Sequence, residues 1–213
     1  MRAARIAICI ALLTTLLFSE KRFNPPPAAQ ASTYPLHETH SDEKVTIAIE
    51  PCDTPETRKA FKTNYSGYAL YPVRLIISND SDSTLMLEDL KIEYITAQRD
   101  KLQPATDDDI YRRLVKPNKA DQGQPGIKLP IPIGKKKEPI SSDTIEEYRT
   151  AQFQKVPVTA HSTNNGYLFF DVIDEGPSPG GHLEISGIKA GTKELFYFDI
   201  SLNKPVNGSS SPN

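Results

Sequence analysis

The chain has 213 residues, of which 24% are charged, 38% hydrophobic and 8% aromatic, and its formal net charge is −2 at pH 7. It contains 18 prolines, 11 glycines, two cysteines and no tryptophan. This composition excludes a multi-span membrane protein, a collagen-like rod, a disulfide-dense miniprotein and a zinc ribbon. The length corresponds to one domain, or to one domain with tails.

The first 31 residues have the composition of an export signal. Arg2 and Arg5 precede a mostly apolar, uncharged run of 13 residues over 6–18, and Ala29-Gln30-Ala31 provides the small residues of an A-x-A cleavage site. A helix of that length rises about 20 Å, too short to cross a hydrocarbon core of about 30 Å. We predict a signal peptide over residues 1–31, cleavage after Ala31 and a periplasmic or extracellular location. The alternative is an uncleaved N-terminal membrane anchor, because the stretch between the apolar run and the cleavage site is unusually long.

Removal of residues 1–31 would leave 21 basic and 26 acidic residues, a net charge of −5. A chain with this balance is not built for nucleic acid. The remaining chain would also hold a single cysteine, Cys52, so no internal disulfide could form. We expect its thiol to be buried, with a free thiol or an intermolecular partner as the alternative.

The first half of the chain predicts a strand-rich domain. Residues 32–43 are polar and are expected to form a flexible N-terminal segment, whereas residues 44–50 alternate between apolar and polar side chains, as in a strand. Residues 70–78 form the strongest predicted strand, and residues 84–96 are expected to return beside them as a hairpin. The apolar phase of the second strand shifts at Asp89-Leu90, which predicts a bulge or a break into two strands.

Two short helices interrupt the predicted strands. Thr106 and Asp109 form a capping box ahead of residues 110–115, and residues 143–153 form a second helical segment. Between them, residues 117–140 contain five prolines and predict a long excursion without regular structure.

The second half of the chain returns to strands. We predict them at residues 155–160, 167–173, 182–188 and 194–202, with turns at residues 164–166 and 190–192. About seven strands without repeated strand–helix alternation predict an all-β fold. The expected architecture is an immunoglobulin-like antiparallel β-sandwich with two inserted helices and a long Pro/Lys-rich loop. It would span residues 44–203, with an insertion at 104–152 and a disordered tail at 204–213.

Two stretches carry a resemblance to a known group of proteins. The first runs from residue 72 through an Asn-Asp-Ser turn to a strand that ends near residue 104, and the second comprises residues 156–161 and the Gly-aromatic strand 166–172. Together they resemble secreted bacterial immunoglobulin-like domains, typified by mycobacterial extracellular antigens and bacterial domains of unknown function. The resemblance covers under half of the chain. It implies an exported β-sandwich and transfers no catalytic residue.

The insertion is strongly basic. Residues 112–137 include eight Lys or Arg residues and one acid, and a run over 129–133 alternates apolar residues with proline, which favours extended backbone. We predict that this insertion contacts an envelope protein, an anionic lipid or a cell-wall polymer. The predicted contact residues are Arg112, Arg113, Lys128, Leu129, Ile131, Ile133, Lys135, Lys136 and Lys137. Two alternatives stay open: a solvated loop balanced by neighbouring acids, and an apolar strip that covers an edge of the sandwich. Aromatic residues are missing between the lysines, which argues against single-stranded nucleic acid.

Other chemistry has weak support in the sequence. His37, His40 and Asp42 have metal-ligand side chains, but their spacing is common in polar segments and fixes no third ligand, so no metal or other cofactor is predicted. The sequence contains no nucleophile elbow, phosphate-binding loop or zinc-protease motif. We therefore predict an exported, non-enzymatic binding or structural module of the cell envelope, with an anchored accessory subunit as a variant. The alternative from another class is a secreted hydrolase with a strand-borne carboxylate pair.

Overall fold

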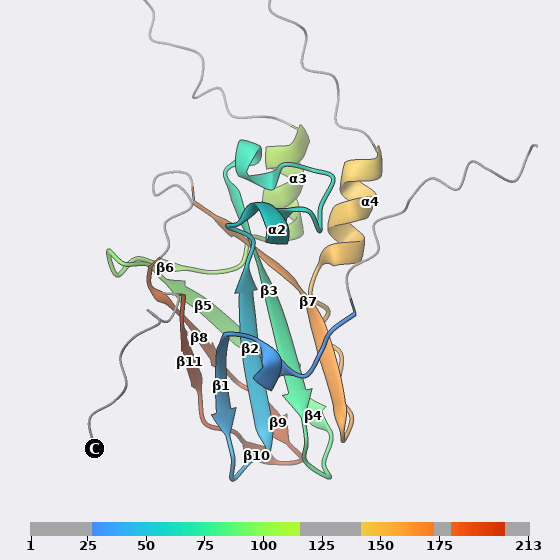
Figure 1. Cartoon of the computed structure of the whole chain (residues 1–213), viewed down its shortest axis with the longest axis vertical. Helices are drawn as coiled ribbons and strands as arrows, with labels where there is room; N and C mark the ends of the chain where they lie inside the picture. Colours follow the sequence, from blue (N-terminus) through green and yellow to red (C-terminus); the bar gives the residue numbers. More distant parts are fainter. Residues whose placement is uncertain (1–26, 116–141, 173–179, 203–213) are drawn as a thin grey trace, which may run out of the picture.

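The computed structural model describes residues 27–115, 142–172 and 180–202, which form a β-sandwich (Figure 1). The first sheet has the strand order β1-β2-β3-β7, the second has β11-β8-β5-β6, and a small third sheet has β10-β9-β4. All strand pairs in these sheets are antiparallel, so the predicted all-β class is confirmed. The strands are β1 (Leu36–His40), β2 (Val45–Pro51), β3 (Leu70–Asn79), β4 (Leu85–Met86), β5 (Lys91–Ile95), β6 (Lys101–Leu102), β7 (Ser162–Asp171), β8 (His182–Ser186), β9 (Lys189–Ala190), β10 (Lys193–Glu194) and β11 (Phe198–Ser201).

Short helices lie mainly at one end of the sandwich, beside β3 and β7 (Figure 1). They are the α-helices α2 (Pro55–Arg58), α3 (Asp107–Val115) and α4 (Ser142–Ala151) and the 3-10 helices η2 (Ala31–Thr33) and η3 (Tyr65–Tyr68). The predicted capping box of α3 is confirmed, because the Thr106 hydroxyl donates to Asp109 Oδ2 over 2.7 Å and accepts from the Asp109 N–H over 3.3 Å. The helix predicted from residue 143 begins one residue earlier.

The main core fills the space between the two large sheets. Along β3, Val73, Leu75 and Ile77 face this core and are fully buried. The intervening side chains, such as Ile76, are also buried, because further chain segments cover the outer face of the first sheet. Burial on both faces explains why β3 is an almost continuous apolar run rather than an alternating one.

The predicted break at Asp89-Leu90 is confirmed, but the predicted hairpin is wrong. Strands β4 and β5 belong to different sheets, and β3 pairs with β2 and β7 instead of either of them. After β3 the chain crosses the sandwich, so that the Leu85 and Leu87 side chains are fully buried in the main core. This crossing positions β5 opposite β7 rather than beside β3.

The prediction of a flexible segment over residues 32–43 is also wrong. Strand β1 occupies much of it and pairs with β2 from Leu36 opposite Ile49 to His40 opposite Val45. Because β1 is an edge strand that buries Leu36 and leaves its other side chains exposed or half-buried, its sequence is as polar as that of a loop. The sandwich therefore begins before residue 44.

Two further predictions in the second half need correction. Residues 155–160 make a single bridge, between Val158 and Leu85, instead of a strand. The predicted turn at residues 164–166 lies inside β7, where Gly166 packs against Phe153: a Cβ on Gly166 would lie 2.4 Å from the Phe153 Cα atom. Glycine is needed there for close approach rather than for a turn.

The remaining strand predictions agree with the structure in type. Strand β8 occupies most of residues 182–188, the turn at residues 190–192 joins β9 to β10, and β11 is the ordered core of the strand predicted at 194–202. The Pro/Lys-rich loop, the tail from residue 204 and most of the predicted signal peptide lie outside the described residues. Among those that are described, no helix is long and apolar enough to span a membrane.

Candidate functional site

Two of the predicted contact residues lie on α3. Arg112 is exposed and forms an ion pair with Asp109 one turn earlier. Arg113 is largely buried and forms an ion pair with Asp171 at the end of β7. The first side chain is open to a partner, whereas the second connects α3 to the first sheet. The structure thus assigns Arg113 an internal partner that its sequence context did not indicate.

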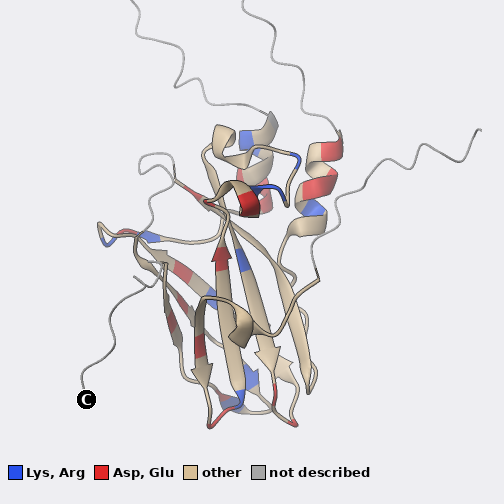
Figure 2. Ribbon diagram, viewed as in Figure 1, with Lys and Arg blue, Asp and Glu red and all other residues tan. Residues whose placement is uncertain are grey.

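The other predicted contact residues lie outside the described part of the chain: Lys128, Leu129, Ile131, Ile133, Lys135, Lys136 and Lys137. Their contact with a partner stays a prediction. In the ribbon that is described, acidic and basic segments are interspersed, with both signs on the helices and at the turns at the opposite end of the sandwich (Figure 2).

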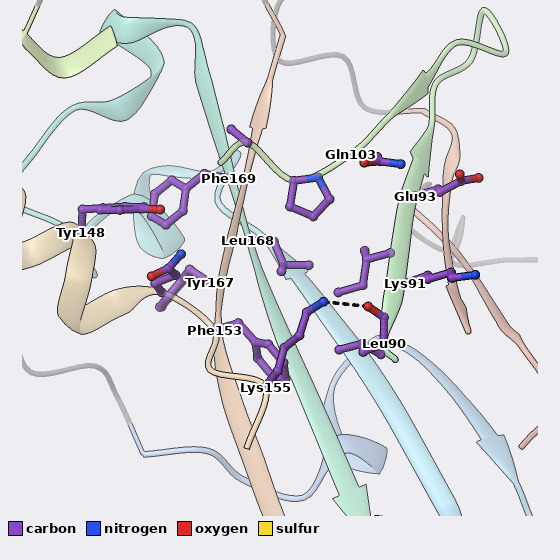
Figure 3. A pocket seen from close by; sticks show the side chains of 14 residues that line it. Leu90, Lys91, Glu93, Gln103, Tyr148, Phe153, Lys155, Tyr167, Leu168 and Phe169 are labelled. Carbon is purple, nitrogen blue, oxygen red and sulfur yellow. Dashed lines mark hydrogen bonds between the residues drawn. The ribbon is translucent and has the colours of Figure 1, made fainter. Parts of the chain in front are cut away.

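The strongest candidate site is a groove of about 360 Å³ on the side of the sandwich where β7 and β5 face each other (Figure 3). We call it the inter-sheet groove. Its walls come from the two large sheets, from the end of α4 and from the segment that follows β6. The residues lining it are Leu90, Lys91, Ile92, Glu93, Gln103, Pro104, Ala105, Tyr148, Gln152, Phe153, Lys155, Tyr167, Leu168 and Phe169.

Apolar side chains from both sheets line the interior of the groove. Ile92 of β5 is 6% exposed, and Leu168 of β7 and Phe153 beside it are each 7% exposed. These values show that the main core is nearly but not fully closed on this side. A ligand seated here would complete the burial of apolar surface.

At one end of the groove, the side chain of Lys155 binds a main-chain carbonyl group. The Lys155 ammonium donates to the Leu90 carbonyl oxygen over 2.8 Å, and this contact crosses between the two walls (Figure 3). An ammonium group has three donors, so the bond to Leu90 leaves two of them for other acceptors. Lys155 is thus positioned to contact a bound ligand.

Further polar groups stand at the rim and already have partners within the chain. Lys101 donates to Glu93 over 2.8 Å. The Tyr148 hydroxyl and the Gln152 amide both donate to Asp107 Oδ1, over 2.7 and 2.9 Å. Burial, followed by the bond to Asp107, raises the pKa of Tyr148, so its hydroxyl stays protonated at neutral pH. This network fixes α4 against α3 and makes the groove wall rigid.

The main chain of β5 also faces the groove, at Ile92. Strands β5 and β6 pair Tyr94 with Leu102, and extension of this register would pair Ile92 with Pro104. Because proline has no N–H, the ladder ends there, and Pro104 instead forms a bridge with Phe170 on β7. The chain after β6 therefore leaves the second sheet and closes the other end of the groove.

Alternation along the ladder fixes the direction of the Ile92 main chain. The Thr96 N–H donates to the Asp100 carbonyl oxygen over 2.9 Å, so Thr96, Tyr94 and Ile92 turn their N–H and C=O groups away from β8. For Ile92, that direction is toward the groove. Among the described residues, no main-chain hydrogen bond outside the strand ladders is found for these two Ile92 groups.

A second polar surface lies at the opposite edge, where β1 meets β11. The His40 ring stacks on Phe198 with centroids 3.8 Å apart, and its nitrogens lie 3.0 Å from Glu38 and 3.1 Å from Glu43. Glu38 also accepts the Asp199 N–H over 2.6 Å, which joins the edges of the two large sheets. The neighbouring Phe196 and Tyr197 are 74% and 61% exposed, respectively. The contacts of His40 with Phe198 and of Glu38 with Asp199 join β1 to β11, whereas Phe196 and Tyr197 stay exposed beside them.

The histidines considered as metal ligands do not converge. His37 Nδ1 lies 2.6 Å from the Tyr34 carbonyl oxygen, on a different face of β1 from His40. No cluster of three potential metal ligands is found within the part of the chain that the structure describes. Cys52 is buried, and burial raises the pKa of its thiol from 9.0 to about 12.

The groove was not predicted, although parts of its signal are present in the sequence. Pro104 near the end of a predicted strand indicates the end of a ladder, and Lys155 as the first residue of a predicted strand indicates a charged edge. Neither residue shows that β5 and β7 face each other across a groove, because that depends on the register of both sheets. The exposed pair Phe196-Tyr197 was likewise indistinguishable from a buried strand segment.

Comparisons with known proteins show no family. No family model matches the chain, and no curated protein matches it. A solved structure of MPT63, a secreted protein from Mycobacterium tuberculosis, is similar with a TM-score of 0.35 and 9% sequence identity, over 83% of this chain and 98% of that one. At this level of similarity, no residue role transfers to this chain.

Proposed function

We propose that the protein is an exported, non-enzymatic binding module of the cell envelope that takes a ligand in the inter-sheet groove. The observation that carries this proposal is the groove itself, of about 360 Å³, with apolar walls from two sheets and polar groups at its ends. Ligand pockets in proteins have volumes of about 300–1,000 Å³, with mostly apolar linings and a few placed polar groups. The size favours a small amphipathic ligand.

The chemistry of the groove favours binding over hydrolysis. A glycoside hydrolase needs one carboxyl group with a raised pKa to act as general acid. Hydrogen bonds from Lys189 and Thr106 lower the pKa values of Asp89 and Asp109, which is the opposite direction. Glu93 lines the groove but is paired with Lys101. The ion pair at Glu93 supports a binding role for the groove rather than the hydrolase alternative.

Export and the basic contact surface are proposed from the sequence. Arg2, Arg5 and the apolar run over residues 6–18 support export. The lysines of residues 128–137 support a contact with an anionic partner in the envelope. In this proposal the two surfaces have separate tasks: the groove holds a small ligand, and the insertion holds a larger partner.

Titration with indole, followed by ¹⁵N NMR of the full chain, tests the groove. We expect saturable shifts at Ile92 and Leu168, both groove residues. Gln103→Trp, which places a ring at the exposed rim, should abolish these shifts, whereas Glu88→Trp, on an exposed residue outside the groove, should not. Shifts that persist unchanged in Gln103→Trp, or that never saturate, would overturn the proposed function.

A further inference from the structure

We infer that the inter-sheet groove recognises the main chain of a short peptide, through the N–H and C=O groups of Ile92. This inference rests on the proposed function and gives its ligand a chemical class. A residue in a strand presents its N–H and C=O on the same side. The partner that satisfies both is the N–H and C=O pair of one residue in an extended peptide.

The geometry at the groove ends limits how much peptide fits. Pro104 blocks further pairing beyond Ile92 toward β6, and the Lys155 ammonium occupies the Leu90 carbonyl oxygen on the other side. One residue of the ligand therefore pairs with Ile92, and its side chain lies against Leu168 and Phe153. The two remaining donors of Lys155 are available to the carbonyl group next along the ligand.

Two matched probes separate this inference from the proposed function. N-acetyl-L-leucinamide carries the donor–acceptor pair of one residue, and its N-methylated analogue lacks the leucine N–H donor. We expect the first to bind at least about fivefold more tightly, the contribution of one net hydrogen bond, and to slow exchange of the Ile92 amide proton. Equal affinities, with indole still bound, would overturn main-chain recognition while the groove remained a ligand site. If no probe binds, including indole, both proposals fail.

A second inference comes from an independent observation, the packing of the residues just before β1. We call residues 28–34 the N-terminal strap, because they cover the outer face of the first sheet. Ala31 is fully buried and packs with Ala48 and Ile76, which are fully buried too. Its N–H donates to the Ser78 hydroxyl over 2.8 Å, and Ser78 is itself bonded to Thr163 of β7 over 2.9 Å.

The strap makes further contacts on both sides of Ala31. The Thr33 N–H donates to the Gln30 carbonyl oxygen over 3.0 Å, and the Tyr34 N–H donates to that of Ala31 over 3.1 Å. The Tyr34 ring lies 6.0 Å from the guanidinium carbon of the buried Arg74. Cleavage after Ala31 would remove the Gln30 and Ala31 carbonyl oxygens that accept these bonds, and it would uncover Ile76. It would also leave the charged amino group of the new N-terminus at the apolar outer face of the first sheet.

We propose that the folded, exported protein keeps residues 28–31, so that the bond after Ala31 is not its processing site. Intact-mass measurement of the full chain, expressed in a host that exports it, should give a first residue at or before Ala28. A mature chain that begins at Ser32 would overturn the proposal.

A second measurement tests the packing of the strap itself. In full chains expressed without export, Ala31→Asp should lower Tm by about 5 °C or more, because it places a carboxylate in a fully buried position. The matched change Ala29→Asp, at an exposed strap residue, should leave Tm unchanged. Equal Tm values for the two variants would show that the strap is not packed and would also overturn the proposal.

Discussion

Gly166 on β7 and Phe153, which follows α4, lie in direct backbone contact. A Cβ atom on Gly166 would lie 2.4 Å from the Phe153 Cα atom and 2.8 Å from its nitrogen. The Phe153 N–H donates to the carbonyl oxygen of the neighbouring Tyr167 over 2.9 Å. This contact holds one wall of the inter-sheet groove against the edge of the first sheet.

Gly166→Ala should therefore destabilise the fold. The nearest atoms are backbone, which cannot rotate away, so the strand and the segment at Phe153 must separate. We expect a loss of about 2–3 kcal/mol in the free energy of unfolding, measured by chemical denaturation. Gly67→Ala is the matched control, because its added Cβ meets its nearest neighbour at 3.6 Å and should change stability by less than about 0.5 kcal/mol. Similar losses for the two variants would contradict the contact.

Glu147 on α4 provides a second prediction. Its carboxylate is buried and accepts the N–H groups of Lys62 and Thr63 over 2.7 and 3.0 Å. Glu147→Ala leaves both donors without their acceptor and should cost about 2–4 kcal/mol. Hydrogen exchange at the Lys62 and Thr63 amides should accelerate in the same variant. The adjacent, exposed Glu146 is the control, and Glu146→Ala should change neither quantity. Unchanged exchange in Glu147→Ala would show that these bonds are not formed in solution.

Patterns within single segments could be predicted from the sequence, whereas contacts between segments could not. The strand predicted over residues 44–50, the capping box at Thr106 and the break at Asp89-Leu90 depend on residues close together along the chain, and all three are confirmed. The hairpin was wrong because a turn cluster does not show whether the next strand pairs or crosses. Crossing is decided by the burial of Leu85 and Leu87 in the core.

The turn predicted at Gly166 and the flexible segment predicted over residues 32–43 were also wrong because they depend on contacts between segments. Gly166 follows two asparagines, a sequence typical of a turn, yet its lack of a side chain serves packing against Phe153. Strand β1 is polar because it lies at the edge of the first sheet, and its sequence therefore cannot be told from that of a loop. The groove depends on the β5–β6 ladder ending before Ile92, and this end can be located only once the register of the two strands is known.

Cys52 should be unreactive in the folded protein. Burial raises the pKa of its thiol from 9.0 to about 12, so almost no thiolate exists at pH 8. In a Cys9→Ser chain, labelling with a disulfide reagent at pH 8 should require unfolding and should be complete in guanidinium. The unfolded thiol ionises from about pH 9 while the folded one stays protonated. Ionisation thus favours the unfolded chain, so the free energy of unfolding should fall as the pH rises from 9 toward 12. Rapid labelling under native conditions would contradict the burial.

The basic insertion is tested by reversing its charge. In the full chain, Lys135/Lys136/Lys137→Glu should lose partners that the wild type captures from an envelope extract, because three attractive charges become repulsive. Lys135/Lys136/Lys137→Arg keeps the charge and should retain them. Capture by the wild type should also weaken as ionic strength rises above about 0.15 M, where exposed charges more than about 8 Å apart are largely screened. Identical partner sets for the Glu and Arg variants would show that the insertion is a solvated loop and that binding belongs to the groove alone.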